Sequence, residues 1–235
     1  MENKMMKNIF KVTALACLMA AASNAVAGPS ANVQVKGTVT QGACTPTLSN
    51  SVIDYGNISS TLLSQGVMQL PSKRTQLSIN CTANTLISLS TIDNRPGTEI
   101  NTTTNFTVEG TGINEDVTNH RGYEEAYGFG FAQYPGGYNR QLGSIVLTIE
   151  YPDMVTDESA DFIARTNGGA WQRNSNGITA ASIREFTLAE PGTITPKAFK
   201  NLTLPLRINA ALVGPVTYAG VNNLDGNISL VVNYL

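Results

Sequence analysis

Short runs of the chain alternate apolar and polar residues, and this period of two is typical of β-strands. Val33, Val35 and Val39 alternate with polar side chains near the start of the chain. The same alternation recurs in runs at 77–81, 127–132, 145–151, 202–208 and 228–234. Turn-forming combinations of Gly, Pro, Asn and Asp separate the runs. Many short alternating strands between such turns predict one all-β domain, an antiparallel β-sandwich.

Three of these runs predict finer detail. A Thr-Ala-Asn turn signal follows the run at 77–81, so we expect residues 86–92 to form its partner strand. The run at 145–151 is expected to keep Tyr151 on the strand. Further on, Pro205 lies on the face opposite a row of leucines. Because proline donates no backbone hydrogen bond, it favours an edge strand or a bulge there.

The first 27 residues have the pattern of a secretory signal peptide. Three lysines precede an apolar run at 12–22, and Ala-Val-Ala at 25–27 predicts cleavage before Gly28. A lipoprotein signal, in which Cys17 becomes the acylated first residue, is the weaker alternative, because the apolar run continues past that cysteine. No other stretch approaches 18 apolar residues, so we expect an exported chain without a membrane span.

Composition and charge narrow the function classes. The 235 residues are 42% hydrophobic and 14% charged, with a formal net charge of −2. These values exclude a highly charged disordered chain and a strongly basic nucleic-acid-binding protein. Removal of the signal leaves Cys44 and Cys81, an even pair that predicts a disulfide in an exported protein. With His120 as the single histidine and no Cys-x-x-Cys, we expect no metal site and no cofactor.

Residues 33–44 resemble the amino-terminal extension of chaperone–usher pilins. In those subunits an alternating strand contains a glycine, here Gly37, and a cysteine follows seven residues later, here Cys44. A second cysteine at the position of Cys81 and a penultimate aromatic residue, Tyr234, also fit the family.

Three further segments are similar to a group of uncharacterised fimbrial-like exported proteins. They are Cys-Thr-Pro-Thr-Leu-Ser-Asn at 44–50, Asp-Tyr-Gly at 54–56 and Ile-Asn-Cys at 79–81. One residue departs from the pilin pattern: many pilins have a glycine fourteen residues from the carboxyl end, where this chain has Asn222.

The resemblance implies an immunoglobulin-like sandwich that lacks its last strand. Residues 28–41 would be the donor-strand extension, and residues 42–235 one pilin-like domain with an expanded middle at about 93–176. A periplasmic chaperone would fill the groove first. An outer-membrane usher would then exchange the chaperone for the extension of a neighbouring fimbrial subunit. The implied function is a structural subunit of a surface fimbria that contributes to cell adhesion, exported through the periplasm to the cell surface.

The resemblance also assigns roles to residues. Val33, Val35 and Val39 would fill a neighbour's groove, and Gly37 would pass where no side chain fits. The last strand would form one wall of this chain's own groove and face the chaperone, through Ile228, Leu230, Val232, Tyr234 and Leu235. The simpler interpretation is that Val33 to Val39 form an ordinary first strand of a closed sandwich.

A function of another class remains open, a self-complete β-sandwich that binds a ligand such as a carbohydrate. Tyr123, Tyr134 and Tyr138 are the candidate contacts, since aromatic faces stack on sugars. The neighbouring Tyr127, Phe129 and Phe131 are expected in the core. The sequence contains no Gly-x-Ser-x-Gly, Walker loop or histidine pair, so we do not expect an enzyme.

Overall fold

The computed structural model describes residues 33–38, 42–59, 66–100, 108–110, 126–133, 136–173, 178–214 and 223–235. The chain divides into two compact units, Met1–Thr40 and Gln41–Leu235. All strands of the described residues lie in the second unit. The expected signal peptide, residues 1–27, lies outside the described residues.

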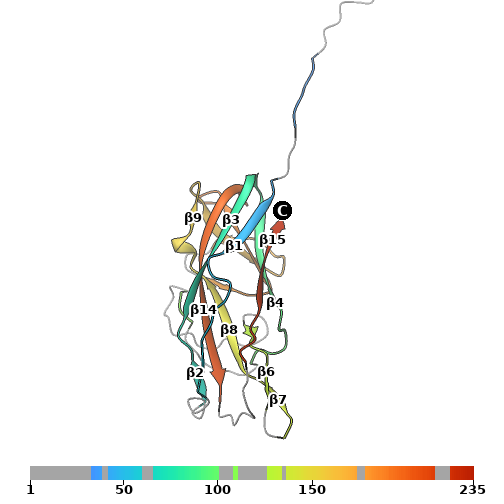
Figure 1. Cartoon of the computed structure of the whole chain (residues 1–235). Helices are drawn as coiled ribbons and strands as arrows, with labels where there is room; N and C mark the ends of the chain where they lie inside the picture. Colours follow the sequence, from blue (N-terminus) through green and yellow to red (C-terminus); the bar gives the residue numbers. More distant parts are fainter. Residues whose placement is uncertain are drawn as a thin grey trace, which may run out of the picture. The chain divides into compact units, whose positions relative to one another are not determined.

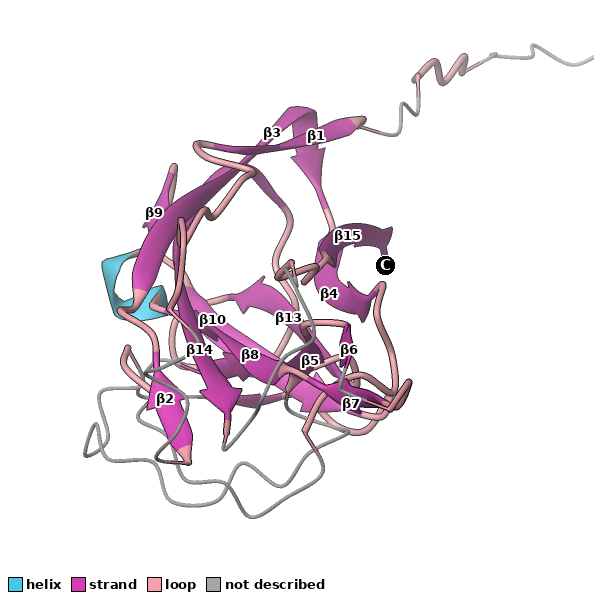
Figure 2. Cartoon of the chain, turned by 60° about the horizontal axis from the view of Figure 1, so that its bottom comes forward, coloured by secondary structure: helices cyan, strands magenta, loops and turns pink. Residues whose placement is uncertain are grey.

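Two antiparallel sheets form the second unit (Figures 1 and 2). The first has the strand order β1 (Cys44–Leu48), β3 (Lys73–Thr85), β14 (Phe199–Val213), β8 (Gly143–Ile149) and β12 (Ile178–Ala180). Short strands extend it: β2 (Val67–Gln69) and β9 (Val155–Thr156) pair with β14, and β5 (Tyr127–Gly128) pairs with β8.

The second sheet has the order β11 (Gln172–Arg173), β10 (Asp161–Thr166), β13 (Arg184–Ala189), β4 (Ile87–Asp93) and β15 (Ile228–Tyr234). A separate two-stranded hairpin joins β6 (Phe131–Gln133) to β7 (Asn139–Gln141), and a 3-10 helix, η2, covers Tyr151–Asp153. The described residues contain no α-helix. The predicted all-β antiparallel sandwich is therefore confirmed.

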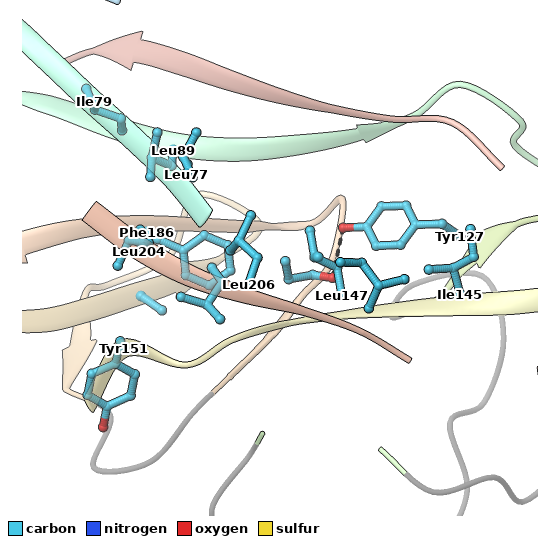
Figure 3. Packing of buried hydrophobic residues seen from close by; sticks show 14 of the residues in the cluster. Leu77, Ile79, Leu89, Tyr127, Ile145, Leu147, Tyr151, Phe186, Leu204 and Leu206 are labelled. Carbon is cyan, nitrogen blue, oxygen red and sulfur yellow. Dashed lines mark hydrogen bonds between the residues drawn. The ribbon is translucent and has the colours of Figure 1, made fainter. Parts of the chain in front are cut away.

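The main core lies between the two sheets, where the apolar faces of their strands meet. Leu204 and Leu206 of β14 are at most 1% exposed, as is Phe186 of β13. Figure 3 shows these side chains packed together. The Tyr127 hydroxyl is buried in the same core, where it donates a hydrogen bond to the Ala180 carbonyl (2.8 Å). Since that bond uses its hydrogen, it accepts the hydrogen bond of the Thr91 hydroxyl (2.5 Å).

The first sheet is also covered on its other face. Val146 of β8 and Ala211 of β14 are fully buried against Val108, in a second small apolar cluster. The segment that carries Val108 is held by Asn209, whose side chain accepts from the Glu109 N–H (3.0 Å) and donates to the Glu109 carbonyl (3.2 Å). Every residue of β8 is consequently buried.

The expected pairing of the run at 77–81 with residues 86–92 is wrong. β3 continues through the predicted turn to Thr85, and its partners are β1 and β14. Residues 87–93 form β4, which pairs with β13 and β15 in the other sheet. The single residue Leu86 connects the two strands, so the chain crosses between the layers there, and Ile87 and Leu89 enter the core from the opposite side.

The expected edge or bulge at Pro205 is also wrong, because β14 lies in the middle of the first sheet. The Pro205 carbonyl accepts from the Glu150 N–H (3.0 Å), just after β8 has ended at Ile149. The nitrogen and the carbonyl of one residue point to the same side of a strand. The proline nitrogen therefore points to the side where the pairing with β8 has ended at Ile149. The proline therefore costs no ladder hydrogen bond.

Two aromatic residues leave the strands expected for them. Gly130 has φ +88°, which interrupts the alternation after Phe129, and Phe131 is 52% exposed instead of in the core. Tyr151 begins η2, because Pro152 ends the strand pairing, and its ring stacks on Phe162 with centroids 4.9 Å apart.

Candidate binding groove

An apolar groove lies within the second unit, between the free edge of each sheet. β1 is the edge strand of the first sheet and β15 is the edge strand of the second (Figure 2). The cavity has a volume of about 780 Å³. Its walls are the segment 48–58 and residues 223–230, and its floor is formed by β8 and β14 together with Phe129 and Leu142.

The β15 wall is a half-buried edge. β15 pairs with β4 from Ile228 opposite Asp93 to Tyr234 opposite Ile87, and no other described strand pairs with it. Alternate N–H and C=O groups of such a strand point away from its partner. Ile228 and Leu230 line the groove, and with Val232 they pack partly buried against the core.

The opposite wall is irregular backbone held by side-chain hydrogen bonds. The Asn50 carboxamide accepts from the Val52 N–H (3.1 Å), and the Asp54 carboxylate accepts from the Gly56 N–H (2.7 Å). These turns direct Ile53 and Tyr55 toward the core. The wall follows β1 but forms no strand pairing of its own among the described residues.

Tyr55 is the unusual polar side chain of this wall. Its hydroxyl is buried and has no hydrogen-bond partner in the described part of the chain. Burial raises the pKa of Tyr55 to about 12. The Lys73 ammonium lies 5.2 Å from the centre of the ring and donates to the Asp54 carbonyl (2.7 Å). The wall of the groove therefore contains a buried, uncharged hydroxyl without a hydrogen-bond partner among the described residues.

The floor is purely apolar. It is formed by buried side chains: Phe129, Leu142, Ile145, Leu147, Leu206, Ile208 and Leu212. Gly226 lies directly over it, because a Cβ at that position would be 2.4 Å from the Ile145 Cδ1 and 3.2 Å from the Phe129 ring. The missing side chain keeps the floor accessible there.

Beyond the groove, a hydrogen bond joins β1 to the end of β15. The Cys44 N–H donates to the Tyr234 hydroxyl (3.0 Å), which bridges β1 and β15. Cys44 is disulfide-bonded to Cys81, as the pair predicted. The Leu235 N–H donates to the Leu86 carbonyl (3.1 Å). Tyr234, Leu235 and Val232 do not line the cavity, so the groove ends before this bridge.

The start of β15 has a different set of contacts. The Asp225 N–H donates to the Phe129 carbonyl (3.0 Å), and the Asp225 carboxylate accepts two hydrogen bonds from Arg95 (2.8 and 2.9 Å). The pKa of Asp225 is lowered, first by the hydrogen bonds from Arg95. No hydrogen bond between described residues joins the 48–58 wall to β15 at this end.

The described part of the extension, residues 33–38, forms no strand. Val33 and Val35 are each 89% exposed. Gly37 has no atom within 4 Å of where a Cβ would be. The described residues therefore do not show the ordinary first strand that was the simpler interpretation. Val39, the third expected plug, lies outside the described residues.

Of the three candidate carbohydrate contacts, the structure describes Tyr138. Tyr138 is 73% exposed, whereas Tyr127 and Phe129 are buried. Tyr123 and Tyr134 lie outside the described residues. Our sequence reasoning gave no role in the groove to residues 50–58, although Ile53 and Tyr55 alternate with polar residues and provided the signal.

No group of three potential metal ligands is found among the described residues. In the same ranges, no helix has the length and apolar character needed to cross a membrane.

Comparison with known proteins defines the class of this chain. The model of a family described as "Protein of unknown function (DUF1120)" matches residues 33–144. The chain is 31% identical to Protein GltF of Escherichia coli K12 over 255 aligned positions, which cover 97% of this chain and 98% of GltF. It is 25% identical to the uncharacterised protein YhcF of the same organism, over 91% of this chain and 94% of YhcF. The chain belongs to the DUF1120 family.

Proposed function

We propose that this protein is a structural subunit of a surface fimbria, assembled by the chaperone–usher pathway through donor-strand exchange, and contributes to cell adhesion. The observation that supports this function best is the apolar groove between the edges β1 and β15. A strand placed there would bond to the free edge of β15 and bury side chains on the floor, which is the β-strand addition mode of recognition.

The extension has the spacing that the groove requires. Val33 and Val35 are two residues apart, as are Ile228 and Leu230 on the wall, so their side chains repeat at about 6.7 Å in an extended strand. Burial of Val33, Val35 and Val39 in the groove would stabilise the complex by about 1.5–3 kcal/mol each. Their sum is comparable to the whole stability of a typical domain, about 5–15 kcal/mol.

The same exposed edge explains the expected partners. An unpaired strand beside an apolar cavity is a site for aggregation, and proteins protect such edges. A periplasmic chaperone that occupies the groove during export, and an usher that exchanges it for a neighbour's extension, would provide this protection.

The test uses the mature chain, residues 28–235, with Val33, Val35 and Val39 replaced by serine, so that it cannot donate its own extension. Its melting temperature is measured alone and with a peptide of residues 28–41. We expect the peptide to raise the melting temperature by at least ten degrees, roughly what 3–5 kcal/mol produces in a chain of this size. A peptide with the same three serines is the control.

If the wild-type peptide does not change the melting temperature, donor-strand exchange is refuted. The cavity volume of about 780 Å³ is also within the range of small-molecule sites. Stabilisation by a small apolar ligand, with no effect of the peptide, would favour the self-complete ligand-binding protein instead.

A further inference from the structure

The two ends of the groove differ, and this fixes how a tethered strand enters. The Cys44–Tyr234 hydrogen bond joins the edge strands β1 and β15 at the end of β15. Cavity-lining residues are concentrated at the start of the strand, where Ile228 and Leu230 lie. A strand attached to the folded body of another subunit therefore has its attachment at the start of β15, since the bridge obstructs the other end.

The β6–β7 hairpin lies at that open end. β6 begins directly after Phe129 and Gly130, and β7 ends directly before Leu142. Phe129 and Leu142 both line the groove, and the Leu142 N–H donates to the Gly130 carbonyl (3.3 Å). Figure 1 shows the hairpin at the opposite end of the sandwich from the start of β1. The hairpin exposes two aromatic residues, Phe131 (52%) and Tyr138 (73%).

The tether is too short to avoid this hairpin. Ala43 of a donor already belongs to its folded unit, since its N–H and carbonyl both bond to Thr82. Only three peptide steps separate Gly42 from Val39, the last plug, and they span at most about 10 Å. The hairpin from Tyr138 to Leu142 spans roughly 13 Å. The donor's body must therefore come within reach of the hairpin when Val39 enters the groove.

We propose that Phe131 and Tyr138 form a docking surface for a second copy of this chain, which meets it with the disulfide end of its sandwich. This inference rests on the proposed function and adds a contact between folded bodies to the inserted strand. The disulfide end carries the exposed side chains of Tyr234 (46%) and Leu235 (47%), and the Tyr234 hydroxyl accepts from Cys44, which follows shortly after the last residue of the extension. Aromatic side chains are enriched in such interfaces. A contact between opposite ends is head-to-tail, which generates an open filament.

The test compares self-association of the mature chain with that of the Phe131→Ser, Tyr138→Ser double variant, by sedimentation velocity over a concentration series. The matched control is Val155→Ser, Ile194→Ser, which removes two exposed apolar side chains (65% and 51%) elsewhere on the surface. We expect the dissociation constant for self-association of the hairpin variant to rise about tenfold or more, because two aromatic anchors are lost. The control variant should associate as the wild type does.

A second measurement separates this contact from strand insertion. The hairpin substitutions are added to the chain whose three extension valines are serine, and the peptide-induced rise in melting temperature is measured. The rise should be unchanged, because the peptide has no body to dock. Equal self-association of the hairpin variant and the control, or a wild type that stays monomeric, would overturn the docking surface. Weaker association of the hairpin variant without any peptide effect would retain the docking surface and reject strand insertion.

Discussion

Removal of the Tyr127 hydroxyl tests the packing of the core most directly. Tyr127 is 1% exposed, and its hydroxyl links Thr91 of one sheet to Ala180 of the other. In Tyr127→Phe the ring remains, but the Thr91 hydroxyl and the Ala180 carbonyl each lose a partner in the core. An unsatisfied buried polar group costs about 1–3 kcal/mol, so we expect a loss of about 2–4 kcal/mol in the free energy of unfolding.

Urea unfolding of the mature chain measures this loss. The midpoint should fall while the slope with urea stays the same, because the surface exposed on unfolding hardly changes. Tyr138→Phe is the matched control, since its hydroxyl is on a 73% exposed side chain. We expect that control to remain within about 0.5 kcal/mol of the wild type. Equal midpoints for the two variants would refute the role of the bridge.

Alkaline pH provides an independent readout of the same hydroxyl. Burial, as the largest cause, raises the pKa of Tyr127 above its ordinary value of 10.0. The unfolded chain therefore releases this proton at lower pH than the folded protein does. The corresponding stabilisation is fully present below about pH 10 and is lost as the pH rises toward the folded pKa. Tyr127→Phe should reduce the slope of stability against pH in this range.

Three further predictions concern other parts of the fold. Reduction of the Cys44–Cys81 disulfide, or Cys44→Ser with Cys81→Ser, opens a loop with a sequence separation of 37. The free energy of unfolding should fall by about 4 kcal/mol. An unchanged urea midpoint would contradict this expectation. Asn209→Ala removes both hydrogen bonds between the Asn209 side chain and the Glu109 backbone. We expect a loss of about 2–4 kcal/mol in urea unfolding, against less than about 0.5 kcal/mol for the exposed Asn139→Ala. Gly226→Val places methyl groups against Ile145 and Phe129 at the groove floor. It should reduce the rise in melting temperature that the peptide of residues 28–41 causes. A rise as large as that without this substitution would show that the peptide does not bind over this floor.

Local patterns were sufficient to predict several of the strands. Residues 77–81, 202–208 and 228–234 alternate with a period of two, and each run lies within a strand of the structure. The period is visible in the sequence because neighbouring side chains of a strand point to opposite faces. Burial of one face therefore makes every second residue apolar. The expected signal peptide and the cysteine count predicted the disulfide for a similarly local reason, since two cysteines lie outside residues 1–27.

Strand partners depended on the tertiary structure. Alternation does not say which strand lies beside which, so β3 and β4 were expected to pair although Leu86 carries the chain into the other sheet. Pro205 is compatible with a central strand only because β8 ends beside it. Phe131 leaves the core because Gly130 adopts a positive φ.

The groove was the feature least visible in the sequence. Its walls come from residues 48–58 and 223–230, which are far apart in the chain and meet only because β1 and β15 are the outer strands of different sheets. Ile228 and Leu230 have the alternation of any half-buried strand, and nothing local distinguishes a covered face from an open one. Whether such a face is covered depends on which segment packs against it, and only the assembled fold decides that.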